Sequence, residues 1–299
     1  MSDNKNTVKG VDLKKKYKKQ GPSKEIWGRL RKNKGAVVGF VIISAIILMS
    51  ILSGFIYDYE TEIINQNIQE RLQSPSAEHW FGTDELGRDI FARIVYGSRT
   101  SLSIGFVTVA FALVVGGTFG AIAGYFGGRI DNIIMRLMDI FLAIPGTLFA
   151  ITIVAALGTS TINLVIALSI SSVPRFARIL RSSVMVVRDV EFIEAAKAIG
   201  ANNWRIITQH VIPNSLAPVI VQTTLTVATI ILTIAGLSFL GLGVSAPQPE
   251  WGAMLSSART YMREYAYMTL FPGLAIMITI LSLNLLGDGL RDALDPRLK

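Results

Sequence analysis

The chain has 299 residues, a formal net charge of +8, 51% hydrophobic residues and only 17% charged residues. Its apolar residues form long blocks without charge, a pattern that excludes a soluble globular domain for most of the chain. The basic charge is not gathered on a folded soluble domain, so nucleic-acid binding is not indicated, and the absence of cysteine excludes disulfides and thiolate chemistry.

Six apolar segments are long enough to cross a membrane, because a helical crossing needs about 20 apolar residues. We therefore expect an all-α polytopic membrane protein with six transmembrane helices. The first segment is too long for a cleaved signal and lacks a small-x-small cleavage site, so we expect it to be retained. The expected crossings lie near residues 36–57, 101–125, 134–157, 161–181, 215–240 and 268–288.

The distribution of Lys and Arg predicts which segments lie inside the cell. With the N-terminus inside, the inner segments carry 23 of these residues, and the outer segments 58–99 and 241–267 carry 6. An even number of crossings then places both termini in the cytoplasm. The chain divides into a cytoplasmic basic tail (1–34), the first transmembrane helix (35–57), an extracytoplasmic loop (58–99), a core of five transmembrane helices (100–290) that includes an inner loop (182–213), and a cytoplasmic C-terminus (291–299).

The basic tail contains the run Lys14-Lys15-Lys16-Tyr17-Lys18-Lys19. Its expected role is a solvated segment that enforces the orientation of the first crossing. The alternative is adhesion to anionic lipid, worth about 1 kcal/mol for each basic residue near the surface.

The extracytoplasmic loop ends in a predicted short helix that lies in the membrane interface. Asp89 is expected to cap this helix, which runs to Tyr96, with Arg88 and Arg93 on its polar side. A metal site is the alternative use of the acidic residues here, but their spacing matches no tight ligand set. The residues considered for that site are His79, Asp84, Glu85 and Asp89.

The second expected crossing carries glycines four residues apart. Small residues at this spacing let helix backbones approach closely in lipid. The stripe is expected to pack either within this chain or against a second, similar subunit. Its members are Gly116, Gly120, Gly124 and Gly128.

The third expected crossing begins with two opposite charges, Arg136 and Asp139, three residues apart on one helix face near the inner surface. We expect them to pair there, with the arginine side chain reaching the headgroups. Pro145 is expected to kink the same crossing.

The inner loop is predicted to hold two short helices rather than a plain connection. Asp189 is expected to cap the first helix, which ends near Ile199, and Gly200 supplies the left-handed residue that stops it. Asn203 is expected to cap a second helix, residues 204–211, and Pro213 to separate it from the next crossing. A slim Ala-rich helix of this kind can dock in a groove on another protein. The alternative is a helix that rests on lipid headgroups.

The fifth expected crossing carries a polar stripe. The four side chains have offsets of 4, 3 and 4 residues, so they lie on one helix face. The threonine hydroxyls can bond back to their own helix, whereas a glutamine amide needs partners in the bilayer. The stripe therefore either lines a hydrated path or forms a helix contact. Its residues are Gln222, Thr226, Thr229 and Thr233.

The inner loop resembles the EAA motif of bacterial ABC-importer permeases, which reads Glu-Ala-Ala, three residues, Gly, nine residues, Ile-x-Leu-Pro. His210 and Ile212 depart from the last part of that pattern. Four other segments resemble the second permease subunit of dipeptide, oligopeptide and nickel importers. They are residues 79–99 (HWFGTDELGRDIFARIVYGSR), 139–145 (DIFLAIP), 237–243 (LSFLGLG) and 287–292 (GDGLRD).

The resemblance implies a type I ABC importer permease fold in the bacterial inner membrane, with peptides as the cargo and nickel as the alternative. It implies a sister permease subunit, two cytoplasmic ATPase subunits and an extracytoplasmic substrate-binding protein as partners. The chain contains no G-x-x-x-x-G-K-[ST], so we expect no enzyme activity and no cofactor in it, with ATP and Mg in the ATPase subunits. The residues implied in ATPase coupling are Glu194, Ala195, Ala196, Gly200, Trp204 and Pro213.

Two other classes of protein compete with this interpretation. An intramembrane protease would need a histidine beside a buried serine, but His79 is expected outside and His210 at the inner surface. A self-powered secondary transporter usually has ionisable groups deep in its crossings, and the apolar segments here have almost none.

Overall fold

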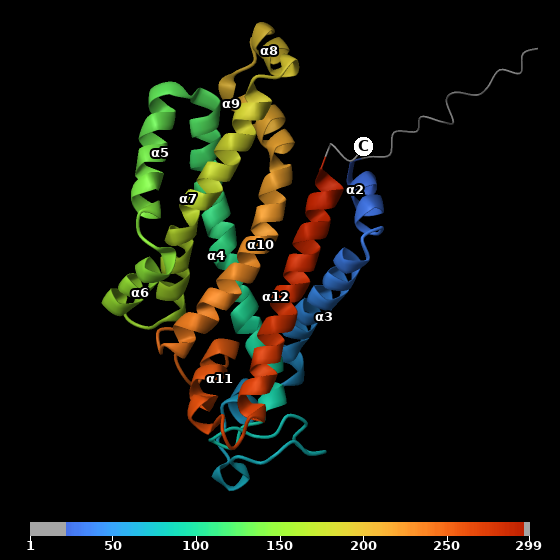
Figure 1. The fold of residues 1–299 in the computed structure, drawn as a ribbon, viewed down its shortest axis with the longest axis vertical. Helices are drawn as coiled ribbons and strands as arrows, with labels where there is room; N and C mark the ends of the chain where they lie inside the picture. Colours follow the sequence, from blue (N-terminus) through green and yellow to red (C-terminus); the bar gives the residue numbers. More distant parts are fainter. Residues whose placement is uncertain (1–21, 296–299) are drawn as a thin grey trace, which may run out of the picture.

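Long helices dominate the computed structural model, which describes residues 22–295 (Figure 1). Within these residues, five helices are long and apolar enough to cross a membrane. Their high apolar content suits lipid, where a helix satisfies all of its own backbone polar groups. They are α3 (Lys34–Ile56), α4 (Ile90–Phe126), α7 (Thr161–Arg188), the run Asn203–Phe239 that contains α10 (Ile212–Phe239), and α12 (Tyr267–Leu294).

The sixth crossing is a broken helix. It consists of α5 (Gly128–Leu142) and α6 (Gly146–Leu157), which are bent by 76° at the break. Pro145 stands at the break as the residue before α6, where its missing N–H costs no helical hydrogen bond. The prediction of an all-helical membrane protein is confirmed, with five candidate crossings among the described residues, or six when the bent pair is counted as one. The predicted kink at Pro145 is a sharp break between two helices.

Shorter elements lie at the two ends of the bundle (Figure 1). One end carries α2 (Pro22–Leu30), α8 (Glu191–Ala198), α9 (Asn203–Ile206) and the last turn of α12; we call it the α8 end. The opposite end carries α11 (Trp251–Ala258) and the loop after α3; we call it the α11 end. The remaining short turns are η1 (Tyr59–Ile63), η2 (Ile68–Glu70), η3 (Ile207–Val211) and η4 (Arg259–Tyr261).

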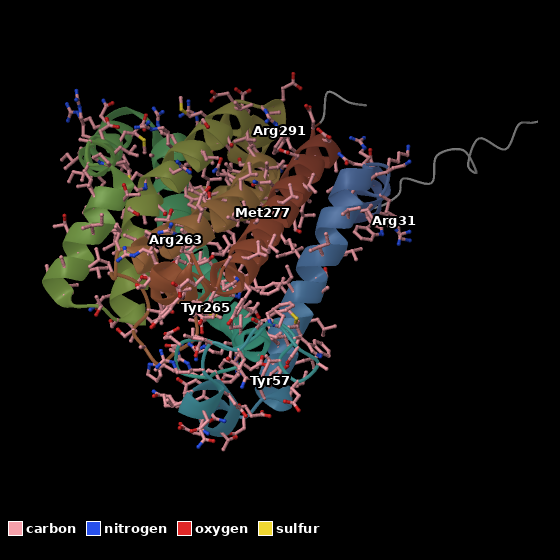
Figure 2. The ribbon with its side chains drawn as sticks, turned by 60° about the horizontal axis from the view of Figure 1, so that its bottom comes forward. Arg31, Tyr57, Arg263, Tyr265, Met277 and Arg291 are labelled. Atoms are coloured by element: carbon pink, nitrogen blue, oxygen red, sulfur yellow. The ribbon has the colours of Figure 1, made fainter. Side chains whose placement is uncertain are left out.

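Figure 2 shows the same two ends with side chains: Arg31 and Arg291 lie at the α8 end, and Tyr57 lies toward the α11 end. The residues expected to form a basic tail include α2, which packs against α12 through Leu30 and Ala293. The lysine run at residues 14–19 lies outside the described residues, as do residues 296–299.

Helix α4 corrects the prediction of a separate interfacial helix before the second crossing. Asp89 caps the helix as predicted, because its side chain accepts a hydrogen bond from the backbone N–H of Ala92. The helix then runs for 37 residues without a break. Arg88 and Arg93, expected on a polar surface, are buried instead. Arg93 donates to the backbone carbonyl of Ile63 at 2.7 Å, so it fastens the preceding loop onto α4.

Glycines on α4 allow a very close approach to α7. A Cβ added at Gly116 or Gly120 would collide with a backbone carbonyl oxygen of α7, and one at Gly124 would lie 2.7 Å from the carbonyl oxygen of Arg181. This packing is internal to the chain. Gly128 does not belong to the stripe: it starts α5 with a φ of +55°, and a Cβ there would meet nothing within 4 Å.

Ion pairs hold α5 against α7. Asp139 accepts from Arg178 at 2.8 Å, so its partner is on the next crossing and not Arg136, as the sequence pattern predicted. Asp131 accepts two hydrogen bonds from Arg181. The two pairs fix α5, the first part of the broken crossing, beside α7.

Candidate functional site

The loop between α7 and α10 forms a knuckle beyond the ends of the crossings, seen at the top of Figure 1. Ile193 and Ala196 are buried and attach α8 to the rest of the molecule. Glu194 and Ala195 are exposed on the other side of the helix. Gly200 follows with a φ of +80°, a left-handed conformation that suits glycine and turns the chain toward α9.

Three apolar side chains of this knuckle are exposed. Phe192 is 43% exposed, Ile199 is 85% exposed and Trp204 is 65% exposed. Large apolar groups at this density on a polar loop are typical of an interaction surface. We name the exposed residues Phe192, Glu194, Ala195, Ile199 and Trp204 the knuckle face.

The knuckle is fastened to the C-terminal end of α4. The hydroxyl of Tyr125 donates to the Oδ1 atom of Asn203 at 2.9 Å, and the ammonium of Lys197 lies 5.7 Å from the centre of the Tyr125 ring. Arg188 donates to the carbonyl oxygen of Gly124 at 2.9 Å. These contacts fix the position of the knuckle relative to the crossings.

Two predicted helix caps in this loop are wrong. Asp189 does not cap α8: Val190 holds the cap position, and Asp189 accepts a hydrogen bond from its neighbour Arg188. The cap of α9 is Asn202, whose side chain accepts from the N–H of Trp204.

Pro213 does not separate a short helix from the fifth crossing. It lies inside the continuous helical run Asn203–Phe239, directly after the π-helical turn η3, so it does not interrupt the helix. The knuckle is therefore joined directly to a crossing.

A polar pocket of about 310 Å³ opens at the break between α5 and α6. Its walls come from α7, from α10 and from the break itself. Thr226, Thr229 and Thr233 of the polar stripe line it, whereas Gln222 does not: its amide donates to the hydroxyl of Thr226 at 3.0 Å. The other polar lining side chains are Thr147, Ser171, Ser172 and Arg175.

The loop between α3 and α4 holds a charged cluster that is structural. Asp84 accepts from the side chain of Arg88 at 2.7 Å and from the backbone N–H groups of Leu86 and Arg88. His79 bonds Asp89 through its Nδ1 atom at 2.8 Å. No group of three His, Cys, Asp or Glu residues within residues 22–295 could hold a metal ion. The acidic residues of this loop form caps and ion pairs.

Sequence reasoning missed a buried carboxylate at the α11 end. Glu250 is 1% exposed and caps α11 by accepting from the N–H groups of Gly252 and Ala253, each at 2.8 Å. It also accepts from Ser238 of α10 at 2.7 Å and from Ser101 of α4 at 3.2 Å. The signal available in the sequence was a single acid before a short apolar segment, which does not reveal partners on two distant helices.

Apolar crossings beside a pocket lined by hydroxyl groups, with an exposed knuckle at one end, describe a multi-pass membrane protein. Residues 116–299 match the family described as the binding-protein-dependent transport system inner membrane component. Residues 21–75 match the N-terminal transmembrane domain of oligopeptide transport permease C. The chain belongs to this family of ABC-importer permeases, in its dipeptide and oligopeptide branch.

Curated relatives match over nearly their whole length. A dipeptide transport system permease from Alkalihalophilus pseudofirmus is 52% identical, over 95% of this chain and 92% of the relative. A glutathione transport system permease from Pectobacterium atrosepticum is 43% identical, over 93% and 92%. A probable D,D-dipeptide transport system permease from Escherichia coli is 42% identical, over 92% and 91%.

Solved structures share the fold at low identity. An inward-facing methionine ABC transporter matches with a TM-score of 0.57 at 19% identity, covering 69% of this chain and 98% of the other chain. An amino acid ABC transporter solved with histidines matches with a TM-score of 0.52 at 14% identity, covering 67% and 94%. At these identities the likeness concerns the fold alone.

Proposed function

We propose that this chain is one of two permease subunits of an ATP-driven importer that carries peptides across the bacterial inner membrane. The names of the three relatives, which refer to dipeptides, glutathione and D,D-dipeptides, favour peptide cargo over nickel. The excess of Lys and Arg on the inner segments supports a cytoplasmic position for the α8 end and for both termini.

The observation that carries the proposal is the knuckle face. Phe192, Ile199 and Trp204 expose apolar surface in a loop that extends beyond the crossings, and Glu194 supplies a charge beside them. A groove on a cytoplasmic ATPase subunit would cover this surface, as grooves cover other amphipathic helices. Ala196 is buried against the body of the permease, so its proposed part in coupling is to anchor α8 and not to touch the partner.

The proposed mechanism is alternating access driven by the ATPase subunits, which would hold the ATP and Mg. Their closure would displace the knuckle, and Trp204 and Pro213 lie on the helical run that continues into α10. Movement of that run would change the walls of the polar pocket, to which α10 contributes three threonines. A substrate-binding protein would deliver cargo at the α11 end, and a sister permease would complete the path.

The polar pocket is the proposed part of the path in this subunit. Hydroxyl groups suit peptide N–H and C=O groups, whereas a path for a desolvated metal ion would favour histidine, cysteine or carboxylate side chains. Gln222 would act indirectly, by fixing the hydroxyl of Thr226.

A charge reversal at Glu194 tests the coupling role. Glu194→Arg is expected to reduce ATP-driven peptide uptake and co-purification of the ATPase subunits, while insertion into the membrane stays normal. Glu264→Arg is the matched control for co-purification of the ATPase subunits, because Glu264 is an exposed glutamate near the α11 end, away from the knuckle face. Normal co-purification and uptake in Glu194→Arg would refute the knuckle face as the ATPase contact.

A second measurement separates this proposal from a secondary transporter. The permease pair reconstituted without ATPase subunits is expected to move no peptide. Peptide accumulation by that pair in an ion gradient would contradict an ATP-driven importer.

A further inference from the structure

The polar pocket contains one charged side chain, Arg175. All other lining residues within residues 22–295 are apolar or carry neutral polar groups. Arg175 is the fifteenth of the 28 residues of α7, so it lies about 20 Å from either end of that helix. A fixed positive charge at this depth needs a hydrated space or an anionic partner, because exposure to lipid costs several kcal/mol.

The other arginines of α7 have their charges balanced. Arg178 pairs with Asp139 at 2.8 Å, Arg181 pairs with Asp131, and Arg188 pairs with Asp189 at 3.0 Å. Arg175 is exposed and forms no ion pair with any of the described residues. Its guanidinium therefore keeps its full set of donors available in the pocket.

The hydroxyl groups beside Arg175 are arranged as acceptors. Ser171 and Ser172, one turn away on α7, both donate to the carbonyl oxygen of Leu168. Across the pocket, Thr229 and Thr233 donate to carbonyl oxygens of α10. Since each hydroxyl proton is used in its own helix, the oxygen lone pairs remain free to accept N–H groups.

The pocket thus combines one strong cationic donor with several neutral acceptors. A peptide with a free C-terminus offers the matching groups: an anionic carboxylate at one end and N–H donors along the backbone. The planar fork of a guanidinium fits a carboxylate with two parallel hydrogen bonds. The first residues of α6 add a smaller positive potential at the same opening, because α6 starts at Gly146.

We propose that Arg175 binds the C-terminal carboxylate of the peptide during its passage, and that the permease itself thereby favours peptides with a free carboxyl end. This inference rests on the proposed peptide-import function. It assigns Arg175 as a specificity-determining residue of the path, separate from any selection made by the substrate-binding protein.

The test compares trialanine with trialanine amide, which has the same backbone without the negative charge. Uptake is measured with the complete reconstituted transporter at saturating substrate-binding protein, and the ratio of acid to amide uptake is recorded. Because the receptor is the same in every sample, its own preference cancels when ratios are compared between permease variants. Arg175→Gln is expected to lower the ratio about tenfold, the effect of one lost hydrogen bond between charged groups.

Two variants serve as controls. Arg175→Lys keeps the charge and is expected to retain most of the preference for the acid. Arg178→Gln removes an arginine one turn farther along α7, but its charge is already balanced by Asp139, so the ratio is expected to stay at the wild-type value.

Three results would overturn the assignment of Arg175. They are a wild-type ratio near one, an unchanged ratio in Arg175→Gln, and a loss of sister permease from purified Arg175→Gln complex, which would make Arg175 an assembly residue. If the wild-type transporter moves neither peptide, the proposed peptide import itself fails. The wild-type measurement therefore distinguishes a failure of the Arg175 assignment from a failure of the proposed peptide import.

Discussion

Glu250 offers the sharpest test of how the α11 end is held together. Its carboxylate is buried and accepts hydrogen bonds from two backbone N–H groups of α11 and from one serine on each of two crossings. In Glu250→Gln, one carboxylate oxygen becomes an amide nitrogen. If that nitrogen replaces the Oε2 atom, it faces the N–H of Ala253, which has no other acceptor at the cap.

The expected loss follows from these contacts. The hydroxyl of Ser238 can rotate and accept from the new amide, but the backbone N–H of Ala253 cannot. One hydrogen bond to a charged group disappears and two donors face each other, which lowers the free energy of unfolding by about 2–3 kcal/mol. A chain of this size loses about 2–4 °C in Tm for each kcal/mol, so the variant is expected to melt about 5–10 °C lower.

The assay is thermal unfolding of the purified permease complex in detergent. Glu264→Gln, on an exposed glutamate of the same end, is the matched control and is expected to leave Tm unchanged. If Glu250→Gln melts within 1 °C of the wild type, the buried carboxylate is not what holds α11 onto the crossings, and the reasoning fails.

Two further predictions concern the contact between α4 and α7 and the cap of η1 in the loop after α3. Gly120→Ala is expected to separate α4 from α7 and to lower the Tm, because the new methyl group meets the carbonyl oxygen of Ala177. Gly236→Ala, which has open space around it, is the control and is expected to leave the Tm unchanged. A Tm for Gly120→Ala equal to that of the control would refute the close contact. Hydrogen bonds from the backbone N–H and the hydroxyl of Thr61 hold the pKa of Asp58 below its usual 3.8. The stability that this cap gives to η1 is therefore fully present above pH 3.8, and it is lost as the pH falls through the lowered pKa of Asp58. Hydrogen-exchange protection of residues 59–64 is expected to fall on acidification in the wild type but not in Asp58→Asn, and the same fall in both proteins would show that Asp58 is not responsible.

The crossings could be predicted because the bilayer imposes a simple requirement of length and apolarity. That requirement located α3, α7, α10 and α12, and it identified the region of the broken crossing. It did not reveal that α4 begins at Ile90, since Arg93 looks like a surface residue until its partner, the carbonyl of Ile63, is known. Local sequence pattern contains no information about a partner 30 residues away.

The candidate sites were predictable to different degrees. The left-handed turn at Gly200 follows from local chemistry. The caps at Val190 and Asn202 each lie one residue from the predicted positions, within the usual variation of helix ends. The threonine stripe could be read from its helical spacing. Arg175 could not be assigned to the same pocket from sequence, because the opposite wall comes from α10, about 50 residues later.

The unbroken length of α4 has a mechanical consequence. The helix has 37 residues, about 55 Å, and it is fixed toward the α11 end by the loop around Arg93 and toward the α8 end by Tyr125. Its closest contact with α7 lies at the glycines between these ends. A stiff rod tied at both tips links the position of the knuckle to that of the loop around Arg93, because neither tip can shift without moving the other.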